Sequence, residues 1–177
     1  MLEYKAHLAL MARYNAVMND RLIATVRPLD DADLLAPRGA FFGSLLGTMN
    51  HLVVADLMWL NRMRPQPFGR TLAALDDLPK PTGLTDMPCP TLAAYEPMRR
   101  QLDGLLVDFI ADLSPDDIAA PLAYRNNKGL PFTKTLGLVL SHVFNHQTHH
   151  RGQITTLLSQ MGLDIGVTDL APLVADV

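Results

Sequence analysis

The sequence is poor in cysteine, with Cys89 alone among 177 residues. One cysteine permits no disulfide within the chain, so nothing in the sequence requires an oxidising compartment, and Cys89 is expected to be an ordinary thiol. The first residues lack a basic head followed by an apolar stretch, so we see no signal peptide. These absences together favour a cytoplasmic protein.

The sequence also lacks any cluster of basic residues and any apolar run long enough to span a membrane. Its 15 Lys and Arg are outnumbered by 18 Asp and Glu, which gives a formal net charge of −3. Such a balance cannot neutralise a row of phosphates. We therefore expect neither a nucleic-acid nor a membrane partner, but a small-molecule substrate.

Hydrophobic residues, in contrast, make up 49% of the chain, and charged residues only 19%. This composition is far from that of a disordered chain and lies at the apolar end of globular proteins. The length suits one core, so we expect a single domain over residues 1–177 with one active site. Some of the apolar surface is expected to be covered by a second copy in a homodimer.

Apolar residues recur at helical spacing in four segments of the chain. The predicted helices cover residues 2–27, 45–63 after an N-cap at Ser44, about 91–113 after a cap at Thr91, and about 133 or 135 to 161 before Gly162. A long irregular connection with six prolines spans residues 65–90. The pattern predicts an all-α fold of the four-helix-bundle type, in which this connection permits non-neighbouring helices to follow each other.

Two shorter segments lie between the third and fourth predicted helices. Ser114 can cap a short helical turn that begins at Pro115, because Pro suits the first helical position and the acids that follow face the positive end of the helix dipole. Residues 122–132 contain Asn and Gly between aromatic residues and are compatible with either a small hairpin or an open loop.

Four of the six histidines fall within the last predicted helix, at His142, His146, His149 and His150. At 100° per residue from His142, the apolar stripe of this helix centres near about 110°, His150 lies at about 80° and His146 at about 40°. His142 and His149 fall at the edge of the stripe or beyond it. His146 and His150, four residues apart, are therefore the pair that can close on one metal ion.

A third ligand must come from another helix, and His51 is the only other histidine within a strongly apolar helix. Three neutral nitrogens with an open fourth position are typical of a catalytic site and suit Zn, Ni, Fe or Cu better than Mg or Ca. The alternatives remain open at this stage, because an HxxxH pair on a helix is a weak pattern. His51, His146 and His150 would otherwise be hydrogen-bonded core or surface histidines.

Several neighbouring residues have two readings. Asp56 lies among apolar residues and would either orient a ligand histidine or bond to another helix. His142 is more suited than His149 to touch the site. Trp59 and the methionines at positions 49, 58 and 63 are expected in the core or on a dimer surface, in preference to a ligand cage.

Three groups of residues resemble the DinB-like (YfiT-like) family of damage-inducible, metal-dependent bacterial proteins. They are residues 14–22 of the first helix, residues 50–60 with His51 and Asp56, and above all the histidine-rich segment 142–154. The tail at residues 162–170 is also similar to the usual ending of the family. The resemblance covers nearly the whole chain.

The resemblance implies a four-helix bundle of up-down-down-up topology, a tendency to form dimers, and a three-histidine site at His51, His146 and His150. It implies nickel or zinc as the most frequent ion. Relatives include thiol S-transferases and a thiol-dependent isomerase that use bacillithiol or mycothiol, so the resemblance implies a metal-dependent transferase or isomerase. The alternatives are a hydrolase that activates water on the metal, or a non-enzymatic metal-binding stress protein.

Overall fold

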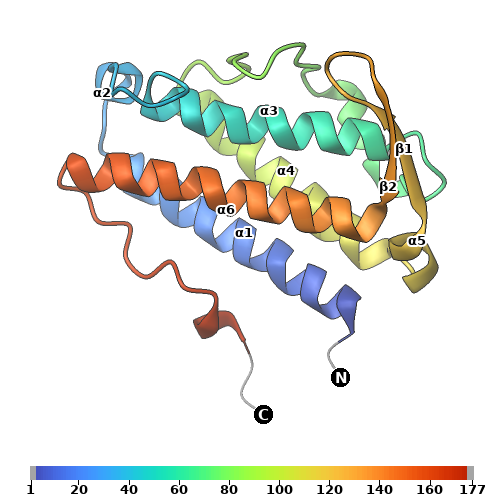
Figure 1. Ribbon diagram of the computed structural model, residues 1–177. Coiled ribbons are helices and arrows are strands. Elements are labelled where there is room, and N and C mark those ends of the chain that lie inside the picture. Colours follow the sequence, from blue (N-terminus) through green and yellow to red (C-terminus); the bar gives the residue numbers. More distant parts are fainter. Residues whose placement is uncertain (1–2, 175–177) are drawn as a thin grey trace.

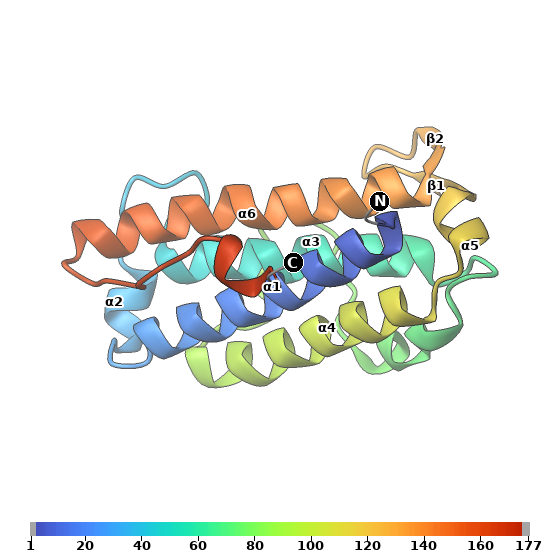
Figure 2. The same ribbon diagram turned by 90° about the horizontal axis from the view of Figure 1, so that it is seen from below.

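Four long helices dominate the computed structural model, which describes residues 3–174 (Figures 1 and 2). The helices are α1 (Tyr4–Val26), α3 (Leu45–Met63), α4 (Leu92–Asp112) and α6 (Leu136–Gln160). They correspond to the four helices expected from the spacing of apolar residues. The fold is therefore mostly helical, as predicted.

The helix ends follow the local chemistry of the sequence. The Ser44 hydroxyl accepts a hydrogen bond from the Gly47 N–H at 3.0 Å and so caps α3, and Thr91 caps α4 in the same way. Beyond α6, Gly162 adopts a φ of +76°, which few other residues tolerate. The predicted caps at these three positions are confirmed.

Within residues 3–174, four short helices accompany the long ones: α2 (Asp31–Leu35), η1 (Arg70–Asp77), α5 (Pro115–Ala119) and η2 (Ala171–Leu173). The turn predicted at Pro115 is α5, which is held by a capping box between Ser114 and Asp117. The other three were not predicted. Each is too short to show a helical repeat of apolar residues.

Residues 121–135 form a small hairpin, which settles the choice between a hairpin and an open loop. Strand β1 (Pro121–Arg125) pairs antiparallel with β2 (Pro131–Thr135), and Tyr124 lies opposite Phe132. Gly129 in the connecting loop has a φ of +77°. The hairpin lies beside the end of α3 (Figure 1). There the Tyr124 ring packs against the Trp59 ring, with their centroids 5.2 Å apart.

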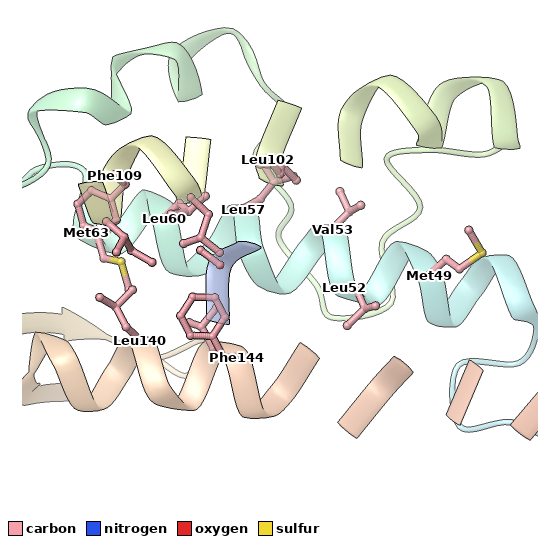
Figure 3. Packing of buried hydrophobic residues seen from close by; sticks show 14 of the residues in the cluster. Met49, Leu52, Val53, Leu57, Leu60, Met63, Leu102, Phe109, Leu140 and Phe144 are labelled. Atoms are coloured by element: carbon pink, nitrogen blue, oxygen red, sulfur yellow. The ribbon is translucent and has the colours of Figure 1, made fainter. Parts of the chain in front are cut away.

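The core lies between the long helices, with α3 and α1 each packed against both α4 and α6. Figure 3 shows Leu60, Met63, Phe109, Leu140 and Phe144 gathered near the hairpin end, from α3, α4 and α6. All five are fully or almost fully buried. Burial of such side chains contributes about 1.5–3 kcal/mol each and accounts for the close approach of α3 and α6.

A buried polar network crosses this core. Arg99 of α4 donates to Asp56 of α3 at 2.5 Å and to Asp103 at 3.2 Å. Asp56 also accepts a hydrogen bond from Gln147 of α6 at 2.6 Å, and Asp103 accepts one from Asn19 of α1 at 2.9 Å. Each long helix therefore supplies at least one member. Burial by itself lowers the pKa of the Arg99 guanidinium, but the neighbouring carboxylates together outweigh this effect and raise the pKa, so Arg99 stays charged.

No helix within residues 3–174 combines the length and the apolar character needed to cross a membrane. This agrees with the absence of a long apolar run in the sequence.

We predict that Arg99→Met lowers the free energy of unfolding by about 3–5 kcal/mol, because it leaves two buried carboxylates without their cation. Urea unfolding at neutral pH measures this loss. The matched control is Arg100→Met, since Arg100 is the next residue and pairs with Asp20 and Glu96 at the surface. Its removal should change stability little. Equal losses in the two variants would contradict a special role for the buried network.

Candidate metal centre

Helices α3 and α6 bring His51, His146 and His150 together. One ring nitrogen from each residue lies within 4.8 Å of the others. The exposed fractions are only 4% for His51 and 8% for His150, while His146 is half-buried. The three residues singled out from the sequence therefore form one cluster in the fold, beneath the surface and open to one side.

The spacing of the ring nitrogens fits a metal ion. The Nε2 atoms of His51 and His146 are 3.2 Å apart. Two nitrogens that each lie about 2.1 Å from a tetrahedral ion are separated by about 3.4 Å, so this pair is already near the required distance. The triad can hold a divalent cation with little rearrangement, and His nitrogens suit zinc or nickel.

The ring of His51 is held by the long connection between α3 and α4. Its Nδ1–H donates to the backbone carbonyl of Leu84 at 3.0 Å, which leaves the lone pair of Nε2 facing the other two histidines. The connection is anchored close by, because the Asn50 side chain donates to the Cys89 carbonyl and accepts from the Cys89 N–H, both at 2.8 Å. Asn50 and His51 thus fix the loop and the ligand together.

His150 is oriented from its own helix. Its Nδ1–H donates to the Gln153 side-chain oxygen at 2.8 Å, so its Nε2 is also left free as a ligand atom. The Phe42 ring stacks on His51 with centroids 3.8 Å apart and meets His150 edge-on at 5.6 Å. This aromatic wall limits the rotation of both imidazoles and keeps water from one side of the triad.

The electrostatics favour neutral imidazoles at the triad. Burial, reinforced by the neighbouring His150 and His51, lowers the pKa of His146 to about 3. Burial also lowers the pKa of His51 and the pKa of His150. All three rings are therefore uncharged near neutral pH, which is the form that binds a metal ion.

A cavity of about 470 Å³ lies in front of the triad. The histidines line it together with Phe42, Trp59 and Arg62. Exposed His142 and His149 are at its rim, with the His142 ring 5.9 Å from that of His146. Both residues thus adjoin the site, and their exposure agrees with the helical phase that placed them at the edge of the buried stripe or beyond it.

Other candidates from the sequence fall elsewhere. Asp56 bonds to Arg99 and Gln147, so its role is the helix-to-helix contact and not the orientation of a ligand histidine. Met49 and Met63 are core residues as expected, whereas Trp59 and Met58 line the cavity.

Cys89 is buried and lacks the features of a reactive thiol. Burial raises the pKa of its thiol to about 11, so the thiolate is scarce at neutral pH. This agrees with the expectation of an ordinary thiol.

Three supports of the site were not found from the sequence: Phe42, the Leu84 carbonyl and Gln153. Gln153 had a signal, since it stands three residues after His150 on the same helix. Phe42 lies just before the α3 cap, but its packing on His51 depends on the path of that turn. A backbone carbonyl leaves no trace in residue type, so Leu84 could not have been identified.

Comparisons with known proteins agree with these observations. The model of the DinB family matches residues 2–173, which is nearly the whole chain. The chain is also similar to Protein DinB of Bacillus subtilis (strain 168), with 24% identity over 156 residues. That match covers 88% of this chain and 87% of the relative.

We predict one tightly held divalent ion per chain. We also expect that His51→Ala, His146→Ala and His150→Ala each lower the affinity for the metal by more than the roughly 10–100-fold loss that follows removal of a hydrogen-bond partner of a ligand. Elemental analysis without a histidine tag and competition with a chelator measure the content and the affinity. His149→Ala is the matched control, because His149 lies at the cavity rim outside the triad. Equal losses in all four variants would refute the assignment.

We also predict that metal-free protein loses stability as the pH falls below about 6.5, the ordinary pKa of histidine. The pKa of His146 is lowered in the fold, so the unfolded chain binds more protons in this range and acid favours unfolding. The effect should continue toward pH 3. Urea unfolding of chelated protein at pH 7.5 and 5.0 tests this, and His146→Gln should reduce the difference. An unchanged difference would count against a neutral, buried His146.

Proposed function

The chain belongs to the DinB family, and from this premise we propose that it is a metal-dependent transferase or isomerase that uses a low-molecular-weight thiol. The observation that carries the proposal is the open side of the triad, where one ring nitrogen of each histidine lies within 4.8 Å of the others beside a cavity large enough for a small molecule. We propose zinc or nickel as the ion, held by His51, His146 and His150.

A divalent ion bound there would supply a Lewis-acid position that favours the thiolate form of a sulfur ligand. The residues of the chain provide the rest. The Leu84 carbonyl and Gln153 orient His51 and His150, and Phe42 shields their rings from water. The cavity then holds an electrophile beside the nucleophilic sulfur, which raises the effective concentration of the two reactants.

The lining of the cavity distinguishes this proposal from a hydrolase. Among the described residues that line it, none is Asp or Glu. A hydrolase of this type needs a general base for the attacking water. In this cavity the role falls to the exposed imidazoles of His142 and His149, outside the triad, whereas a thiol that binds a metal ion loses its proton without such a base.

Cys89 does not supply that sulfur in this proposal. Its side chain is buried, and the raised pKa of its thiol keeps it protonated. The nucleophile must therefore come with a diffusible cofactor.

We further propose that the four long helices form an up-down-down-up bundle. The packing of α1 and of α3 against both α4 and α6 supports this arrangement. The connection between α3 and α4, residues 64–91, is long enough to return along the molecule, so these two helices can run in the same direction.

We predict that turnover of an electrophile such as a haloarene or a maleyl compound requires both metal and thiol. A panel of bacillithiol, mycothiol, glutathione and no thiol, with metal-loaded and chelated protein, measures this requirement. Cys89→Ser should retain activity and His150→Ala should lose it, while His149→Ala controls for the loss of a histidine near the site. Hydrolysis of esters or amides at the same rate without thiol would replace the proposal.

A further inference from the structure

The cavity at the triad continues along one side of α3. Five residues of α3 line it, and their successive separations of four, three, one and three residues place them on one face of the helix. They are His51, Ala55, Met58, Trp59 and Arg62. Arg62 is eleven residues after His51, which corresponds to about 16 Å along the helix axis and almost the same angular position. The cavity is thus elongated, with the triad toward one end and Arg62 toward the other.

Two further cavities adjoin it through shared lining residues. One of about 290 Å³ shares Arg62 and Asn127 with it, and one of about 710 Å³ shares Trp59 and His142. The charged residues that line the three cavities are Arg62, Lys80 and Lys134, and no Asp or Glu of residues 3–174 lines any of them. This is unexpected in a chain with more acids than bases. We call these joined cavities the cationic cleft.

Arg62 has the features of an anion-binding residue. Its guanidinium lies over the Trp59 ring at 4.6 Å and the Tyr124 ring at 5.3 Å, and it donates to the Asn127 side chain at 2.7 Å. Within the described chain no carboxylate oxygen approaches it within 4.0 Å, unlike Arg64, which pairs with Asp76.

This arrangement holds the guanidinium in place before any ligand arrives. Burial lowers the pKa of Arg62, which is the expected effect on a cation that is withdrawn from water without an anionic partner. Only one hydrogen bond uses its five N–H donors among the interactions described above. The remaining donors are available for a bidentate contact with an oxyanion.

We propose that the cationic cleft binds an elongated anionic small molecule, whose carboxylate or similar oxyanion is bound by Arg62 while its reacting atom lies at the triad. The inference rests on the proposed function in one respect, which is the identity of the reacting atom at the triad. Because the side chains of a helix lean toward its N-terminus, Arg62 reaches back toward His51. The anionic group should therefore lie on the order of 10 Å from the reacting atom.

The charge can belong to the thiol or to the electrophile, and paired probes separate these sources. For the thiol we use N-acetylglutathione and its uncharged diethyl ester, which share the sulfur and differ in the carboxylates. For the electrophile we use 4-(4-chloro-3-nitrobenzamido)butanoate and the corresponding butanamide, which are long enough to reach from the triad to Arg62. Trp59 is the sole tryptophan and lies against Arg62, so its fluorescence reports thiol binding directly. Calorimetry serves the nitroarenes, because they absorb the emitted light.

In at least one pair, the acid should bind metal-loaded protein about tenfold or more tightly than its neutral partner. Arg62→Gln should remove that preference, and Arg62→Lys should retain part of it. Arg64→Gln, just beyond the end of α3 and outside the cleft, should leave it unchanged. High salt should weaken the acid more than the neutral probe.

Equal binding of acid and neutral probe in both pairs would overturn the inference. An equal loss of affinity for the acid and the neutral probe in Arg62→Gln would also overturn it, because that result would indicate a packing role for Arg62. Circular dichroism of each variant verifies the fold. An acid preference in the thiol pair assigns the charge to the cofactor, and one in the electrophile pair assigns it to the substrate. Charge-selective binding without turnover with any thiol would reject the proposed function and leave this inference standing.

Discussion

The hydrogen bond between Asp56 and Gln147 is the constraint on which the candidate site depends. A buried carboxylate requires partners, and Arg99 and Gln147 provide them from α4 and α6. Gln147 directly follows His146, and Asp56 stands five residues after His51. A shift of α6 by one turn would leave Asp56 without its amide partner. The register that satisfies this carboxylate is therefore the register that brings the histidines together.

The network and the site divide the polar residues of the core into two kinds. Asp56 and Asp103 both pair with Arg99 within the interior, whereas the triad and its cavity contain neutral rings without a carboxylate among their described lining residues. A divalent ion at the triad would consequently keep its full positive charge. Together with Arg62, such an ion would give the cleft a strongly positive potential within a protein of net negative charge. Anions would be drawn toward the reacting centre.

Much of this architecture follows from the sequence because its causes are local. Ser44, Thr91 and Gly162 mark helix ends through their own hydrogen bonds or backbone angles. The inward phase of His146 and His150 follows from the helical repeat of their neighbours.

What the sequence could not predict depends on the path of the backbone. Whether Asp56 orients a ligand histidine or bonds to another helix was decided by the positions of α4 and α6. The stacking of Phe42 on His51 was decided by the turn before α3. The placement of Trp59 in the cavity wall depended on the hairpin that packs against it. The Arg62 guanidinium likewise lies between aromatic rings and an amide, without a carboxylate partner, only because α3, β1 and the hairpin loop meet there.

The contact between His51 and the Leu84 carbonyl has an evolutionary consequence. The loop between α3 and α4 supports the site through main-chain atoms, since Cys89 also contributes only its N–H and carbonyl to Asn50. A change of side chain at position 84 or 89 does not remove these groups, whereas an insertion or deletion moves them. Selection on this contact therefore acts on the length and course of the loop, and not on the identity of the half-exposed side chain at position 84, while the histidine that its carbonyl supports is retained.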